Sequence, residues 1–125
     1  MRNLLKSLHR DQQGTTAVEF AIVAPVFIAL LIGTLALCVA FFLIGSMHFA
    51  VEDAARCASV NTAVCADSPT TVAYAKSRYY GPNVSPTFTY AAAACGSSVT
   101  GTISYSMDVG FRTFTIPVSA TACFP

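Results

Sequence analysis

One apolar run, from Phe20 to Val51, contains no Asp, Glu, Lys or Arg. As a helix that rises 1.5 Å per residue it would measure about 48 Å, whereas the hydrocarbon core of a bilayer is about 30 Å thick. The run is therefore long enough to cross a membrane, and its outer third must then tilt or project as a stalk. What remains is a short N-terminal flank and a C-terminal part large enough for one small domain.

The charged residues around this run indicate its orientation. Arg2, Lys6 and Arg10 precede it, and Glu52 and Asp53 follow it. Because basic residues accumulate on the cytoplasmic flank of a span, we expect a cytoplasmic N-terminus and a translocated C-terminal part. An ordinary cleaved signal peptide fits poorly, since its apolar region is only about 7–15 residues long. An uncleaved single-pass anchor remains an alternative.

The composition also indicates burial in a membrane or an assembly. Only 10% of the residues are charged, against roughly 25% in typical soluble domains. The net charge of +1 gives no reason to expect a nucleic-acid partner.

A carboxylate stands at the start of the apolar run. Glu19 directly precedes Phe20, and an unpaired charge within a bilayer costs about 2.5–3.5 kcal/mol on insertion scales. Gly14 lies five residues upstream. Cleavage after Gly14 would create an α-amino group on Thr15, four residues from Glu19, which could pair with the carboxylate.

A basic leader, Gly14, and Glu19 at the head of an apolar helix resemble the prepilin-peptidase signal of type IV pilins and pseudopilins. The segments Thr16-Ala-Val-Glu-Phe-Ala-Ile-Val-Ala-Pro25-Val-Phe and Leu30-Leu-Ile-Gly33 resemble more closely the TadE-like pseudopilins of the Tad (Flp-type) pilus machinery. The resemblance resumes at Glu52-Asp-Ala-Ala-Arg-Cys57. The family often has a second glutamate three residues after the glycine aligned with Gly33, and this chain has Ala36 there.

The resemblance implies a structural minor pseudopilin that prepilin peptidase cuts between Gly14 and Thr15, with Glu19 as the assembly carboxylate. The implied location is the bacterial inner membrane, with a cytoplasmic N-terminus and a periplasmic head, or a surface pilus. The implied partners are the peptidase, the lipid bilayer, other pilins or pseudopilins and the Tad assembly machinery. A major pilin is an alternative within this class, although such chains are usually shorter. A single-pass anchored periplasmic binding domain that never enters a filament is the alternative from another class.

The predicted organisation is a cleaved cytoplasmic leader over 1–14, a transmembrane helix over 15–51 and a periplasmic or extracellular head over 52–125. Pro25 lacks an N–H and should kink the helix. Ala29 and Gly33 form a small-xxx-small pair that would let another helix approach closely.

The head is expected to combine one short helix with strands. Ser68 as N-cap, Pro69 in the first turn and Gly81 as the stop predict a second helix. Period-two alternation then predicts strands over 87–90, 99–107 and 111–119, with a turn at 108–110. The predicted fold class is α+β: a long N-terminal transmembrane helix continuing into a small head with a short helix and a three-stranded antiparallel sheet.

Four cysteines lie outside the apolar run, in a compartment expected to be oxidising, and four cysteines allow three connectivities. Cys57 and Cys65 can meet if the helix ends near Asn61, because an unbroken helix would hold them about 12 Å apart. We favour Cys57–Cys65 and Cys95–Cys123. A four-thiolate metal site is the rival, but the sequence has no Cys-x-x-Cys spacing, so we expect no metal and no cofactor.

Catalytic motifs are missing from the sequence. His9 and His48 are the only histidines, and no nucleophile-elbow, phosphate-loop or His-Glu-x-x-His pattern occurs. We therefore expect no enzymatic activity. The aromatic residues of the C-terminal half are expected to form core.

Overall fold

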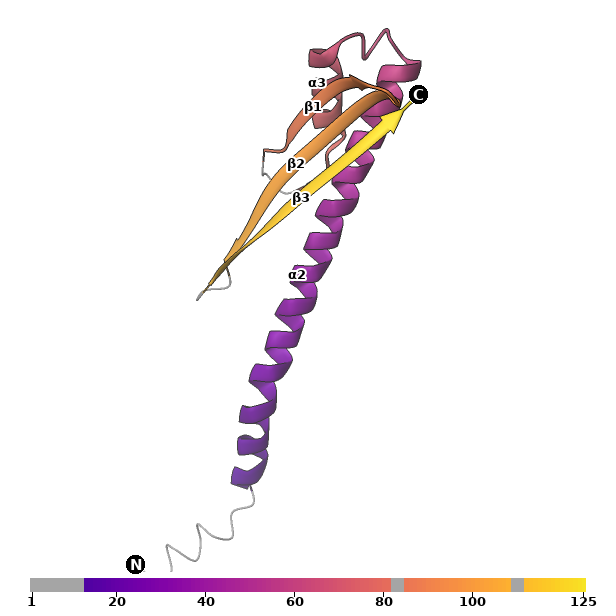
Figure 1. Cartoon of the computed structure of the whole chain (residues 1–125). Helices are drawn as coiled ribbons and strands as arrows, with labels where there is room; N and C mark the ends of the chain where they lie inside the picture. The colour runs from indigo at the N-terminus through magenta and orange to yellow at the C-terminus, as the bar shows by residue number, and fades with distance from the viewer. Residues whose placement is uncertain (1–12, 82–84, 109–111) are drawn as a thin grey trace, which may run out of the picture. The chain divides into compact units, whose positions relative to one another are not determined.

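The computed structural model describes residues 13–81, 85–108 and 112–125 (Figure 1). Helix α2 runs from Gln13 to Val60 and helix α3 from Ser68 to Arg78. The strands are β1 (Thr87–Ala93), β2 (Gly96–Asp108) and β3 (Thr113–Phe124), which form an antiparallel sheet in the order β1-β2-β3. The predicted α+β class is confirmed. The first twelve residues of the leader, and 109–110 of the predicted turn, lie outside the described residues.

The chain divides after Cys38 into two compact units. In the N-terminal unit, the helical residues from Gly14 onward are exposed on nearly every side, and only Ala24 and Ala36 are partly covered. Within the described part of the chain, α2 is the one helix long and apolar enough to cross a membrane. The second unit begins at Val39, upstream of the predicted head boundary at residue 52, which remains a prediction.

The core of the second unit lies between α2, α3 and one face of the sheet. The buried α2 residues recur every three or four positions, as on one side of a helix, and the buried β2 residues alternate. The core side chains are Met47, Ala50, Val51, Ala54, Ala55, Ala75, Phe88, Val99, Ile103, Val118 and Ala120. Residues between 43 and 51 that the sequence pattern assigns to the span thus already belong to the core of the head.

Two glycines shape the sheet. Gly96, which begins β2 after the tight β1–β2 turn, has a φ of +117°, and a Cβ there would collide with the backbone of Phe124. Gly101 lies in the middle of β2, where a Cβ would stand 2.5 Å from Sδ of Met47 and 2.8 Å from Cε1 of Phe88. The absence of a side chain at Gly101 therefore allows α2 to approach the sheet closely.

The second helix is confirmed, but both of its predicted ends are wrong. Asp67, not Ser68, is the N-cap: the Thr70 N–H donates to Asp67 Oδ1 at 2.9 Å, and the Asp67 N–H donates to Thr70 Oγ1 at 3.1 Å. This reciprocal capping box satisfies two backbone donors at once. The hydrogen bonds from the Thr70 hydroxyl, and then from its N–H, lower the pKa of Asp67.

The helix ends at Arg78 and not at Gly81. Tyr79 is extended, and the Tyr80 N–H donates to Ser46 Oγ of α2 at 2.8 Å, so a contact with the long helix replaces a further helical turn. Gly81 has a different role, because a Cβ there would overlap the ring of Tyr79.

The three predicted strands are confirmed, but their bounds differ from the predicted ones. β1 and β2 are longer, and β2 includes Asp108 of the predicted turn. β3 starts at Thr113, after the predicted start at 111, which lies outside the described residues, and it continues to Phe124. β3 pairs only with β2 among the described strands, so Pro117 lies on an edge strand, where its missing N–H removes no ladder hydrogen bond from a central position.

We predict that Gly101→Ala lowers the free energy of unfolding by about 1–3 kcal/mol, because the added methyl overpacks the helix–sheet contact. Urea unfolding of the full chain in detergent, followed by circular dichroism, would measure the loss. In a double-mutant cycle, Gly101→Ala should cost less in a Met47→Ala background than in the unsubstituted chain, because that background lacks the sulfur that the methyl meets. Thr102→Ala, at the neighbouring exposed position, is the control; an equal effect of both alanines would contradict close packing at Gly101.

Candidate processing and assembly segment

The predicted cleavage point lies at the first turn of α2. Gln13 and Gly14 are already helical, Thr15 is exposed, and a Cβ at Gly14 would meet nothing within 4 Å. The first N–H groups of a helix lack intrahelical acceptors, so this turn is the part of α2 that unwinds at least cost. A requirement for glycine at position 14 cannot come from packing in the described chain and would have to come from an enzyme that binds it.

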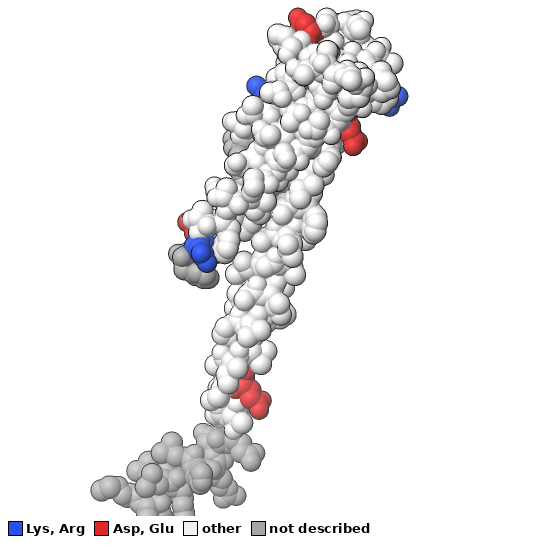
Figure 2. Space-filling view, in the orientation of Figure 1, with Lys and Arg blue, Asp and Glu red and all other residues white. Residues whose placement is uncertain are grey.

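Glu19 lies one helical turn after Thr15, and residues four apart share a face of a helix. Both residues are exposed. Glu19 is also the only charged residue between Gln13 and Cys38. Figure 2 shows how sparse charge is on one face of the molecule, with isolated acidic and basic patches on an otherwise uncharged surface.

Pro25, Ala29 and Gly33 all lie within α2, which continues through the proline. A Cβ at Gly33 would meet nothing within 4 Å, and Ala29 is exposed. The described chain therefore gives no steric reason for small residues on this face. The kink at Pro25 and the packing role of Ala29 and Gly33 remain predictions.

The side chains around this segment are apolar and uncovered. The large residues of the N-terminal unit that are exposed are Val18, Phe20, Ile22, Val23, Val26, Phe27, Ile28, Leu30, Leu31, Ile32, Leu35 and Leu37. A helix that is hydrophobic on all sides is stable only where lipid or other protein surrounds it.

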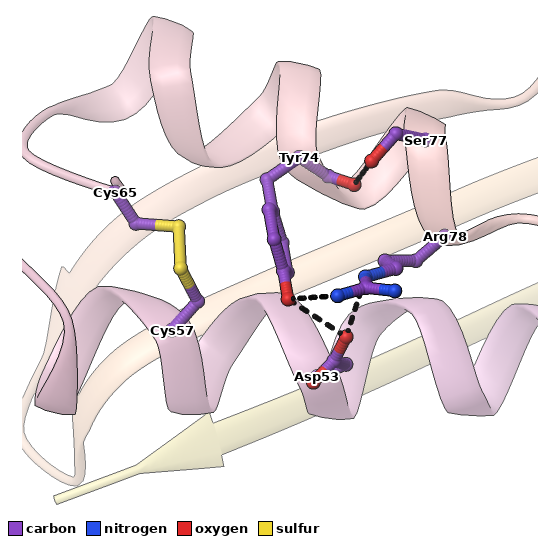
Figure 3. A network of polar contacts seen from close by, with 6 residues as sticks. All are labelled: Asp53, Cys57, Cys65, Tyr74, Ser77 and Arg78. Carbon is purple, nitrogen blue, oxygen red and sulfur yellow. Dashed lines mark hydrogen bonds and ion pairs between the residues drawn. A yellow bond between two sulfur atoms is a disulfide. The ribbon is translucent and has the colours of Figure 1, made fainter.

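In the second unit, a polar network joins α3 to α2 (Figure 3). The hydroxyl of Tyr74 donates to Oδ2 of Asp53 at 3.1 Å, and Nη2 of Arg78 donates to that hydroxyl at 2.8 Å. Nε of Arg78 lies 3.0 Å from the same carboxylate oxygen, an ion pair without hydrogen-bond geometry. The guanidinium also lies over the Tyr74 ring, 4.8 Å from its centre. The hydrogen bond with Tyr74, ahead of the charge of Asp53, raises the pKa of Arg78.

Sequence reasoning missed this network. Tyr74 and Arg78 are four residues apart on a helix, a spacing that brings side chains together, and this was the available signal. Their acidic partner comes from another helix, so periodicity within α3 could not identify Asp53.

Both favoured disulfides are confirmed. Cys57 and Cys65 are bonded with their Cα atoms 5.8 Å apart, and Cys95 and Cys123 with theirs 6.2 Å apart. The first bond is possible because α2 ends at Val60 and the Cys65 N–H turns back to donate to the Asn61 carbonyl at 3.0 Å. The second ties the β1–β2 turn to the C-terminal end of β3.

The remaining candidate residues form no catalytic or metal-binding group in the described chain. Cys38 is a free, exposed thiol of the helix, and His48 and Arg56 are exposed. Arg112 stacks over Phe114, with 5.9 Å between the guanidinium carbon and the ring centre. Among the described residues, no three His, Cys, Asp or Glu side chains are placed to hold a metal ion.

These features define a class of protein: a candidate membrane anchor at the N-terminus, joined to a small disulfide-bonded α+β head. The family model for TadE-like proteins matches residues 14–56, from the predicted cleavage site to the Ala-Ala-Arg stretch. Residues 14–56 are therefore similar to TadE-like proteins, as the sequence indicated. The search of curated proteins and the search of solved structures return no match.

The geometry explains part of the matched motif. Ala54 and Ala55 are fully buried against the head, so larger residues would separate helix from sheet. Asp53 anchors α3 through Tyr74 and Arg78. The motif outside the span thus has a folding role in this chain.

We predict that replacing Cys95 and Cys123 together by serine lowers the free energy of unfolding by about 3–4 kcal/mol, since the bond closes a loop with a sequence separation of 28. Urea unfolding with and without reductant would measure the loss. Cys38→Ser is the matched control and should change nothing. Recovery of free thiols at both positions from the oxidised, unsubstituted chain would contradict the bond.

Proposed function

We propose that this chain is a minor pseudopilin of a Tad (Flp-type) pilus. In this proposal α2 holds it in the bacterial inner membrane, with the leader in the cytoplasm and the head in the periplasm. The observation that carries the proposal is the exposed apolar helix of the N-terminal unit, headed by Gly14 and Glu19 within the TadE-like match.

In this proposal the bilayer-spanning part is shorter than the segment 15–51 expected from the sequence. About 20 helical residues cross a 30 Å hydrocarbon core, so a span that starts at Phe20 ends near Val39. This is where the second unit begins. Burial in the head core starts at Leu43, and a residue covered by the head has no need of lipid. We therefore place the span at about 20–39 and include the rest of α2 in the head.

Processing would occur between Gly14 and Thr15. The scissile bond lies at the helix start, where the chain can unwind into a peptidase without disturbing the span. The product would carry a positive amine on Thr15, one turn from Glu19, which gives the carboxylate a partner in its own chain or in a neighbour shifted along the filament axis.

Assembly would then depend on apolar contact and on this one charge pair. Apolar packing alone does not select an axial offset between two helices, because many offsets bury similar area. A buried carboxylate without a partner is strongly unfavourable, so the pairing with an amine selects one offset. The face of Ala29 and Gly33 would allow the helices to approach closely in that offset.

A membrane-anchored binding domain that never enters a filament is the second candidate. An open groove of about 540 Å³, lined by Phe49, Glu52, Arg56 and Phe124 among others, favours it. This alternative makes Glu19 dispensable for the protein's role, so the variants below distinguish the two functions.

We predict that the mature chain begins at Thr15. Intact mass of the membrane-extracted protein, produced with its prepilin peptidase, would show the loss of residues 1–14. Gly14→Leu should leave the precursor uncut, because the peptidase must accommodate the residue next to the scissile bond, whereas Gly14→Ala should still be cut in part. A protein that retains Met1 or Arg2 in the presence of active peptidase would contradict the prediction.

We predict that Glu19→Ala is inserted and cut normally but does not support pilus formation. Removing the carboxylate leaves the span more apolar and the cleavage site intact, while it abolishes the charge pair that selects the offset. Crosslinking to other pilins and counting of surface pili would measure the effect, with Glu52→Ala as the control. Normal pili in the Glu19 variant would favour the anchored binding domain.

A further inference from the structure

The β2–β3 hairpin meets α2 at two levels, and beyond the second it points in the direction of Val39, the residue at which the second unit begins. At one end of the sheet, the Ser59 hydroxyl donates to the carbonyl of Pro125 at 2.9 Å, directly after β3 ends. Further along β2, Gly101 lies against Met47. From the first contact to the second, the sheet passes from Ser59 to Met47 along the helix, and β2 then continues in that direction to Asp108.

The hairpin is long enough to reach the level of Val39. Seven residues separate Gly101 from Asp108, and at about 3.3 Å per residue they extend up to about 23 Å. Eight helical residues separate Met47 from Val39, which is about 12 Å at 1.5 Å per residue. The hairpin is therefore long enough for its end to reach the level of Val39, where the helix leaves the hydrocarbon core in the proposed span.

The residues at this end have the composition of a membrane interface. We define the hairpin end as residues 104–108 and 112–116. Its core-side positions are Tyr105, Met107, Phe114 and Ile116, of which Phe114 is 49% exposed and the others are partly exposed. Its other face carries hydroxyl residues beside Pro117.

The charged residues of the C-terminal part of the chain also lie at the hairpin end. From Ser85 to Pro125 the only charged residues are Asp108 and Arg112, one of each sign, and Arg112 stacks on Phe114. Aromatic rings and arginine side chains favour the headgroup level, where an apolar body meets lipid and a polar tip meets water. A zwitterionic headgroup layer can accept both charges.

We propose that the hairpin end lies in the outer headgroup layer of the membrane that holds α2, with Phe114 at the boundary of the acyl chains. The proposal rests on the membrane insertion put forward under Proposed function. Lipid is favoured over a second copy of the chain because the proposed span ends near Val39 of the same chain. The hairpin would thus act as a second membrane contact of the chain.

The chain contains no tryptophan, so one introduced indole reports on a single place. Phe114→Trp and Phe124→Trp put this reporter at exposed aromatic positions at opposite ends of β3, up to about 33 Å apart. Each full-length variant is reconstituted at one chain per nanodisc, in phosphatidylcholine with or without phosphatidylcholine brominated on the upper acyl carbons. Intact Cys95–Cys123 bonds in both variants confirm that the head is folded.

Brominated lipid should quench the indole of the Phe114→Trp variant several-fold more than that of the Phe124→Trp variant, and the first variant should emit to the blue of the second. Equal, weak quenching in both inserted variants would overturn the proposal while leaving membrane anchoring intact. Emission from Phe114→Trp that shifts to the blue only when discs carry two chains, without quenching by lipid, would assign the surface to a second copy and also overturn it. Failure of both variants to copurify with discs would refute the anchoring itself.

Discussion

The contact between α2 and the sheet at Gly101 is the interaction on which the head depends. Met47 fills the space left by the missing side chain, and the alanines at 50, 54 and 55 keep the helix close along the following turns. The sheet is only three strands wide, and its other face is rich in serine and threonine, so it has a single apolar face to bury. The long helix covers that face, and the smaller helix α3 is then held by Cys57–Cys65 and by the pairing of Asp53 with Arg78.

The elements of this fold could be predicted because each has a strong local period. A charge-free run of helical length and strands of alternating threonine and apolar residues leave few other choices. The burial of Leu43, Met47 and Val51 in the core could not be predicted, since these residues are as apolar as the exposed residues before them. Hydrophobicity indicates that a side chain avoids water, and it does not distinguish lipid from protein core. The predicted N-cap of α3 was wrong for a related reason. The neighbouring residues Asp67 and Ser68 can both cap a helix, and the hydrogen bonds between Asp67 and Thr70 decide between them.

The candidate site likewise has a part that could be predicted from the sequence and a part that could not. Gly14 and Glu19 could be identified from the sequence because their proposed roles depend on their spacing along one helix. The disulfide pairing could be predicted because four cysteines allow only three connectivities, and a helix end near Asn61 permits the pairing of Cys57 with Cys65. The polar network of Asp53, Tyr74 and Arg78 could not be predicted, because it joins two helices whose packing depends on the whole head. Local patterns thus identified the segment proposed for processing, and tertiary structure was needed to find what stabilises the head.

The two halves of α2 have different relations to their surroundings, and this difference separates folding from assembly. After Leu43 the helix has one side covered by its own chain, so the head keeps its core wherever the protein is located. Before Val39 little in the described chain covers the apolar side chains, so in the proposed assembly this half would exchange lipid for neighbouring helices. Such an exchange changes apolar burial little, and the free energy that favours one arrangement must come from the few polar groups present. Among the described residues of that half, Glu19 is the only charged one. In the proposed filament, its pairing with an amine would therefore be the interaction best able to select a geometry without affecting the fold.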